Sequence, residues 1–162
     1  MKKSSRVLSL AFVGFALLLE IDFSAAQSRA ASKSVTRKSA ILWAPVELKW
    51  TDIPNVTGAK QAILWGDPNT RAHGVFVKFP AGTEVPLHTH SHEGRGVVIS
   101  GILVIALEGQ TPKELGPGSY FFVPAAVKHK TTCKSGADHC LFLDQSPGAF
   151  DIKIVEATAT KK

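Results

Sequence analysis

Short apolar runs separated by turn residues make up the chain from residue 41 onward. Apolar and polar residues alternate within several runs, and the breaks between them are rich in Pro and Gly, as in GDPN, PAGTEVP and EGQTPKELGPGS. Alternation with a period of two is typical of half-buried strands, and no segment after residue 26 has a helical period. Strands are predicted at 46–50, 61–64, 74–79, 85–89, 96–107, 119–123, 127–132, 141–144 and 151–155. Many short strands at regular spacing favour an all-β sandwich or barrel.

The first 26 residues follow a different pattern. A short basic start is followed by an uncharged apolar run at 7–19 and by small residues at Ser24 and Ala26. The run is too short to span a membrane, which takes about 20 apolar residues, but it suits a secretory signal. We predict a signal peptide at 1–26, a flexible Ser/Ala/Lys-rich linker at 27–40 and a single domain at 41–158. The alternative is an N-terminal anchor that is not cleaved.

Length and charge narrow the range of partners. The chain has 162 residues, enough for one well-buried domain, and a formal net charge of +6. Basic residues gather only in the linker and at the C-terminus, where they are typical of solvated tails. With export to the periplasm or the medium, neither a nucleic-acid partner nor a membrane span after cleavage is expected.

Three of the six histidines occupy alternating positions in PLHTHSHEGRG, namely His88, His90 and His92. On a strand, residues two apart face the same side. Two such imidazoles can bind one metal ion together, and imidazole suits several divalent transition metals. A surface or structural pair of histidines is the alternative, since a lone His-x-His is a weak signal.

A second stretch, GPGSYFFVPAAVKHK, places His129 after a turn, a strand and a proline. With this stretch the chain resembles the cupin superfamily, whose small jelly-roll barrels (double-stranded β-helices) hold a metal between two motifs. Gly82, His88, His90 and Gly101 match the first motif, G-x5-H-x-H-x3-E-x6-G. The second motif, G-x5-P-x-G-x2-H-x3-N, is matched by Gly118, Pro124 and His129, with Ala126 at the second Gly and Cys133 at the Asn. The amino-acid sequence of this second stretch also resembles that of the ChrR-like group of cupins.

One departure concerns the metal ligands. The motif glutamate would fall on residue 94, which is Gly94, and Glu93 lies one residue away. A slip of one residue turns a strand side chain to the opposite face. Three ligand sets therefore stay open: His88, His90 and His129 alone, these three with His92, or these three with Glu93 through a bulge at a glycine. The resemblance implies one divalent transition metal, whether Fe, Zn, Mn, Ni or Cu.

The two cysteines, Cys133 and Cys140, flank a six-residue loop. In an oxidising compartment this spacing predicts a disulfide across a hairpin. The alternatives are a thiol that faces the metal pocket and a redox-active pair.

The function implied by the resemblance is binding of, or action on, a small molecule at the metal. Oxygenase-type or isomerase-type chemistry is one hypothesis, because three protein ligands leave metal positions open. A sensing cupin without turnover and a barrel that has lost its metal are the alternatives. A homodimer is a further expectation from the superfamily, and fold alone does not decide between these functions.

Overall fold

The computed structural model describes residues 39–136 and 139–156. The predicted signal peptide at 1–26 and nearly all of the predicted linker lie outside these residues; Ser39 and Ala40 are exposed and irregular. The elements, in chain order, are η1 (Pro45–Glu47), β1 (Trp50–Asp52), β2 (Lys60–Gly66), β3 (His73–Pro80), β4 (Glu84–Thr89), β5 (Gly94–Ser100), β6 (Leu103–Leu107), β7 (Lys113–Leu115), β8 (Tyr120–Val123), β9 (His129–Cys133), β10 (His139–Ser146) and β11 (Lys153–Ile154).

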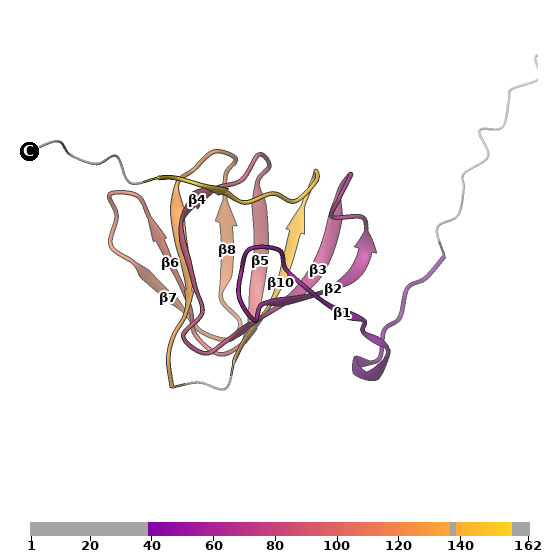
Figure 1. Ribbon diagram of the computed structural model, residues 1–162. Coiled ribbons are helices and arrows are strands. Elements are labelled where there is room, and N and C mark those ends of the chain that lie inside the picture. The colour runs from indigo at the N-terminus through magenta and orange to yellow at the C-terminus, as the bar shows by residue number, and fades with distance from the viewer. Residues whose placement is uncertain (1–38, 137–138, 157–162) are drawn as a thin grey trace, which may run out of the picture. The chain divides into compact units, whose positions relative to one another are not determined.

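The strands form two antiparallel sheets, which confirms the all-β prediction. One sheet has the order β1-β2-β3-β10-β5-β8, and the other has the order β11-β4-β9-β6-β7. From β3 onward the chain changes sheet after every strand except β6, so the strands wind back and forth between the two sheets as in a jelly roll (Figure 1). Among the described residues, no helix has the length and apolar character that crossing a membrane requires.

Inward-facing residues of both sheets fill the space between them. Val75, Val77 and Phe79 alternate along β3 with less buried neighbours, as the period of two predicts. Phe79 meets Phe142 of β10 edge to face, with ring centroids 5.3 Å apart. The same core cluster includes Val85 of β4 and Leu103 of β6 in the other sheet, so apolar packing holds the two sheets together.

The predicted strand at 96–107 is two strands, because the chain turns from one sheet to the other at Gly101. Gly101 has a φ of +74°, which L side chains rarely adopt. A Cβ at this position would also lie 2.5 Å from the carbonyl oxygen of His139 and 2.9 Å from Cys140 Cα. This turn was not predicted, because the apolar residues on both sides of Gly101 form strands and look like one continuous strand in the sequence.

Two other predictions of local structure differ from what the model shows. Residues 46–50 were expected to be extended, but Pro45 begins a single 3-10 turn and β1 starts only at Trp50. The Pro- and Gly-rich break at 108–119 contains a short strand, β7, which pairs with β6.

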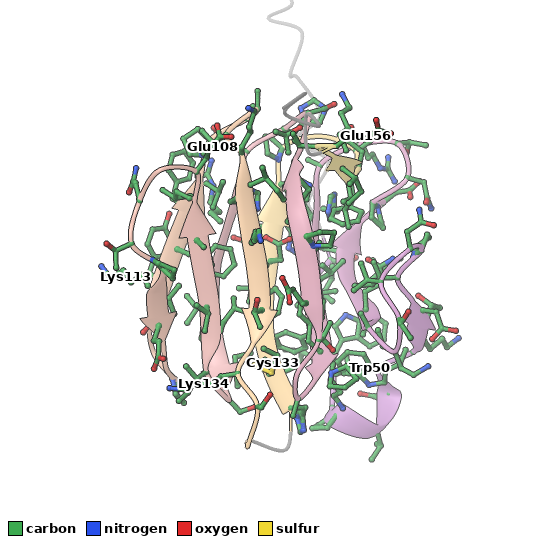
Figure 2. All side chains as sticks on the ribbon, turned by 60° about the vertical axis from the view of Figure 1, so that its left-hand side comes forward. Trp50, Glu108, Lys113, Cys133, Lys134 and Glu156 are labelled. Atoms are coloured by element: carbon green, nitrogen blue, oxygen red, sulfur yellow. A yellow bond between two sulfur atoms is a disulfide. The ribbon has the colours of Figure 1, made fainter. Side chains whose placement is uncertain are left out.

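Cys133 and Cys140 form a disulfide that joins the end of β9 to the beginning of β10, near the label of Cys133 in Figure 2. Their Cα atoms are 5.7 Å apart, and neither residue is exposed. Because β9 and β10 belong to different sheets, the bond links the two layers of the barrel.

The variant Cys133→Ala/Cys140→Ala should unfold more easily than the wild type. Closing a loop of about eight residues lowers the entropy of the unfolded chain and stabilises the fold by about 2.5 kcal/mol. Urea unfolding of the oxidised proteins measures this difference. Under reducing conditions the wild type should approach the variant; equal stabilities under oxidising conditions would contradict a stabilising disulfide.

Candidate metal centre

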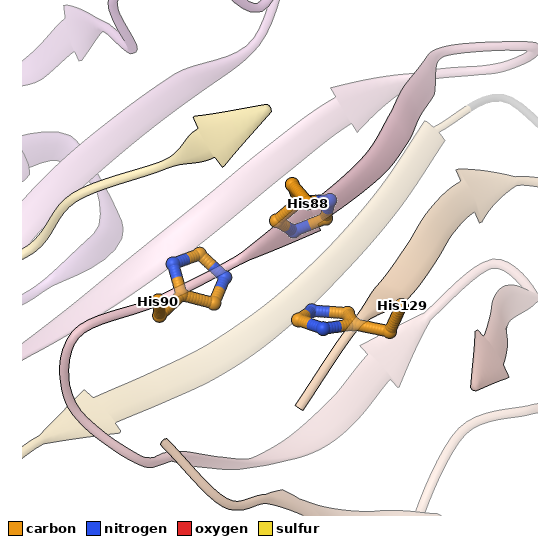
Figure 3. Close-up of side chains that lie close together, drawn as sticks. All are labelled: His88, His90 and His129. Carbon is orange, nitrogen blue, oxygen red and sulfur yellow. The ribbon is translucent and has the colours of Figure 1, made fainter. Parts of the chain in front are cut away.

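Three histidines from two neighbouring strands meet inside the barrel. His88 lies near the end of β4, directly opposite His129, the first residue of β9, in the register of this antiparallel pair. Opposite residues of paired strands share a face. His90 follows one residue after β4 ends, and its ring lies beside the other two (Figure 3).

One ring nitrogen from each of these residues lies within 4.8 Å of the others. The ring centroids are 4.2 Å apart for His88 and His129, 4.9 Å for His88 and His90, and 5.3 Å for His90 and His129. His88 and His129 are buried, and His90 is partly buried. The structure thus brings together three of the histidines that the sequence singled out.

Backbone carbonyl groups determine which nitrogen of each ring carries the hydrogen. His88 Nδ1 lies 2.7 Å from the carbonyl oxygen of Pro86, and His129 Nδ1 lies 2.9 Å from that of Val127. His90 Nδ1 makes the same kind of bond to the carbonyl oxygen of Asp151. A carbonyl only accepts, so each Nδ1 donates its hydrogen and each neutral ring keeps a lone pair on Nε2.

Burial keeps the rings of His88 and His129 neutral. It is the largest cause that lowers the pKa of His88 to about 4, and the nearby His129 and His90 lower it further, while the hydrogen bond to Pro86 opposes them. Burial also lowers the pKa of His129. A metal ion binds neutral imidazole, so at neutral pH no proton competes for these nitrogens.

The three histidines therefore fit a divalent transition metal. They offer three borderline nitrogen donors, each oriented through a hydrogen bond at its other nitrogen, which is the usual surrounding of a metal-binding histidine. A bound metal would be held by His88, His90 and His129 and would supply Lewis-acid or oxygen chemistry.

His92 and Glu93, the two other ligands considered from the sequence, lie along the same cavity but outside this cluster. The strand parity that would have added His92 ends with β4 at Thr89; His92 is exposed, and its ring lies against Gly148. Glu93 forms an ion pair with Arg95. The arrangement thus favours the set of three histidines among the three alternatives.

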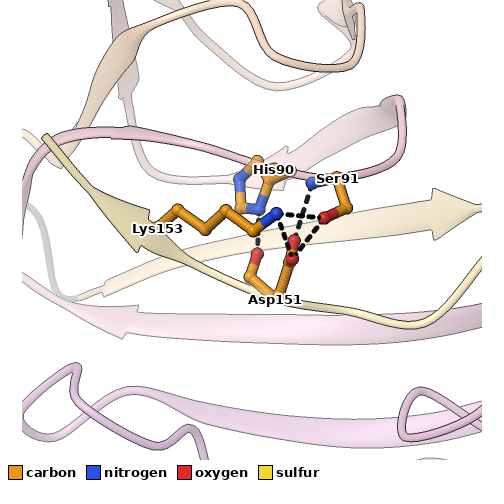
Figure 4. A network of polar contacts seen from close by, with 4 residues as sticks. All are labelled: His90, Ser91, Asp151 and Lys153. Carbon is orange, nitrogen blue, oxygen red and sulfur yellow. Dashed lines mark hydrogen bonds and ion pairs between the residues drawn. The ribbon is translucent and has the colours of Figure 1, made fainter.

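The segment after β10 holds His90 in place (Figure 4). Besides accepting from His90, Asp151 accepts hydrogen bonds from Ser91 N at 2.7 Å and Ser91 Oγ at 2.6 Å, and Lys153 Nζ lies 3.5 Å from its carboxylate. Burial raises the pKa of Asp151, but the bonds from Ser91 and the charge of Lys153 outweigh it and lower the pKa overall. No local pattern predicts this contact, because it joins residues that are 61 positions apart.

Ala126 fixes the other side of His90. Its N–H donates to the carbonyl oxygen of His90 at 2.9 Å. Ala126 has a φ of +61°, in the left-handed region that favours glycine, and it stands at the motif position where glycine was expected. The glycine of the motif thus marks a position with a positive φ, and in this chain Ala126 adopts that backbone conformation.

The cluster lies in a cavity between the two sheets. Four phenylalanines, Phe79, Phe121, Phe142 and Phe150, line it together with aliphatic side chains. Its polar lining residues are His88, His90, His92, Glu93, His129, Thr131, Asp144, Ser146 and Asp151. An apolar cavity with a few convergent polar groups is the usual form of a small-molecule site.

Barrel, sheet order and histidine cluster together define a cupin. Solved structures of similar fold include an RmlC-like cupin from Shewanella frigidimarina, which is 28% identical with a TM-score of 0.54 over 67% of this chain and 92% of that one. The family described as "Domain of unknown function (DUF4437)" matches residues 23–153, and the chain belongs to this family.

Two further comparisons involve enzymes. The polyketide cyclase RemF from Streptomyces resistomycificus has a TM-score of 0.62 at 20% identity, over 75% of this chain and 89% of that one, which shows a shared fold. The dimethylsulfoniopropionate lyase DddQ of Ruegeria pomeroyi is 36% identical over 55 residues, or 34% of this chain. That match spans 27% of DddQ, about a quarter of its length.

Replacing Asp151 by Ala should weaken metal binding without removing a proposed ligand. The substitution removes the side-chain bonds from Ser91 that hold Asp151 in place, while the Asp151 carbonyl that accepts from His90 remains. Loss of such supporting contacts costs roughly 10- to 100-fold in metal affinity. Titration of metal-free protein with Co²⁺ or Zn²⁺ measures the change. The control Lys153→Ala removes an exposed amine that bonds Ser91 Oγ but keeps both hydrogen bonds from Ser91 to Asp151, so its effect should be smaller. Equal affinities for wild type and Asp151→Ala would contradict a supporting role for Asp151.

Proposed function

We propose that this protein is an exported, metal-dependent enzyme that acts on a small organic molecule in the histidine cavity. The single observation that carries the proposal is the convergence of three imidazoles on an apolar cavity, each with its Nδ1 bonded to a backbone carbonyl and its Nε2 left for a metal. His88, His90 and His129 are the proposed ligands. Three protein ligands leave metal positions for a substrate or water, as in catalytic rather than structural sites.

Isomerase- or lyase-type chemistry, which is redox-neutral, is the reaction class that we favour. The cavity contains a carboxyl group, Asp144, that can exchange protons with a bound molecule. The local similarity to a lyase supports the same class. A bound metal would polarise an oxygen of the substrate, while the phenylalanines exclude water from its apolar part.

A sensing protein that binds metal and ligand without turnover is the alternative. Metal content and products distinguish the two functions. An enzyme converts its substrate and releases a product, whereas a sensor changes its shape or its oligomeric state when metal or ligand binds.

The variant His88→Ala/His129→Ala should contain no metal, whereas the wild type should contain close to one equivalent. The substitutions remove two of three donors, and the single remaining imidazole binds a metal weakly. Mass spectrometry of the purified proteins measures the metal content, and circular dichroism checks that the variant is folded. A wild type that stays metal-free after reconstitution would exclude the proposed function; iron, manganese or copper would favour oxygen chemistry over the redox-neutral class.

Export is the second part of the proposal. The apolar run at 7–19 with its basic start supports it, and so does the buried disulfide, since disulfides persist in oxidising compartments. Expressed in a bacterium with a periplasm, the mature protein should begin at Gln27 and carry no free thiol. Intact-mass measurement of the periplasmic fraction tests both expectations. A full-length, reduced chain in the cytoplasm would contradict export.

A further inference from the structure

Asp144 carries a carboxyl group whose two oxygens do not both find a hydrogen-bond partner in the fold. It lies in β10, the strand between β3 and β5, opposite Val75 on one side and Gly96 on the other. The residue keeps some accessible surface, but its Oδ1 atom is buried and has no hydrogen-bond partner. Within residues 39–136 and 139–156, no other buried side-chain nitrogen or oxygen lacks a partner.

The two other carboxylates along the cavity are engaged. Glu93 pairs with Arg95, and Asp151 accepts from Ser91 and faces Lys153. Native folds rarely leave a buried polar atom unpaired, because it loses its bonds to water without replacing them. An unpaired oxygen on a cavity wall is therefore suited to a group that arrives with a ligand.

The neighbouring strand leaves space beside this oxygen. A Cβ at Gly94, in β5, would meet Asp144 Oδ1 at 3.6 Å and no other described atom within 4 Å outside its chain neighbours. Any larger side chain at position 94 would extend into the space beside the carboxyl group. Gly94 lines the cavity as Asp144 does, and it places no side chain beside Oδ1.

We propose that Asp144 binds the oxygen-bearing group of the small molecule in the cavity and exchanges a proton with it. The proposal rests on the proposed function in one respect: the ligand is taken to occupy the histidine cavity. The cavity places one unpaired carboxyl group among phenylalanine side chains. A ligand with a hydroxyl or carbonyl group on an apolar body about the size of a ring would complement that lining.

The charge state of Asp144 suits this role. Burial raises its pKa to about 7, with a hydrogen bond from the backbone of Gln145 opposing the shift. Both forms are therefore present at neutral pH. The neutral acid donates its proton to a ligand oxygen, and the carboxylate takes a proton from a ligand O–H or C–H, leaving the electron pair on the ligand.

A pair of shape-matched probes, phenol and toluene, tests the proposal on the full-length protein as purified and again after metal removal. Affinities are measured by NMR titration. The wild type should prefer phenol by about five- to tenfold, the value of one net hydrogen bond. In Asp144→Leu the preference should disappear, whereas Asp144→Asn, which keeps a donor and an acceptor, should retain part of it. Asp52→Asn, at an exposed carboxylate on β1, is the matched control.

Unfolding in urea provides a second readout. A ligand-binding role predicts that Asp144→Leu is at least as stable as the wild type, because it removes an unpaired buried oxygen. Loss of stability in both Asp144 variants would assign the residue to the fold and overturn the proposal, as would equal affinities of the wild type for the two probes or a preference for phenol that persists in Asp144→Leu. These outcomes do not depend on metal content, so this inference and the proposed function can fail separately.

Discussion

The hydrogen bond from each histidine Nδ1 to a backbone carbonyl is the interaction on which the centre depends. An imidazole buried in an apolar barrel has two nitrogens to satisfy, and a carbonyl satisfies one of them in a defined tautomer. The other nitrogen is then left as an acceptor facing its counterparts. Burial lowers the pKa of His88 and His129, so the same apolar walls that pack between the sheets also keep these two rings neutral and able to bind a cation.

The three hydrogen bonds differ in the sequence separation between the histidine and the carbonyl group that accepts from it. Pro86 and Val127 lie two residues before His88 and His129, so those rings are oriented within their own strands. His90 lies beyond the end of β4 and is oriented by Asp151, on the segment that returns to the barrel as β11. The ring of His90 is therefore oriented only when the C-terminal segment has docked on the barrel. Formation of the three-histidine cluster depends on that docking.

The sequence predicted the features that are encoded locally. Alternation and turn residues predicted two layers of short strands, and motif spacing singled out His88, His90 and His129. The strand break at Gly101 was missed, because the apolar residues before and after it both form strands and make one continuous run in the sequence. Whether His92 joins the cluster also depends on where β4 ends, and that is set by pairing with β9 and β11 rather than by local pattern.

The glycine at position 94 illustrates the same limit. Along the chain, it is a position where a carboxylate was expected and none is found, and the neighbouring His92 and Glu93 are the candidate replacements. Across the sheet, the carboxyl group nearest to it belongs to Asp144, fifty positions later, whose oxygen lies 3.6 Å from where a side chain at 94 would begin. Register between β5 and β10 creates this proximity, and a single sequence does not reveal register. Gly94 on β5 and Asp144 on β10 thus place a carboxyl group beside position 94 from a neighbouring strand, and a search along the chain alone does not find it.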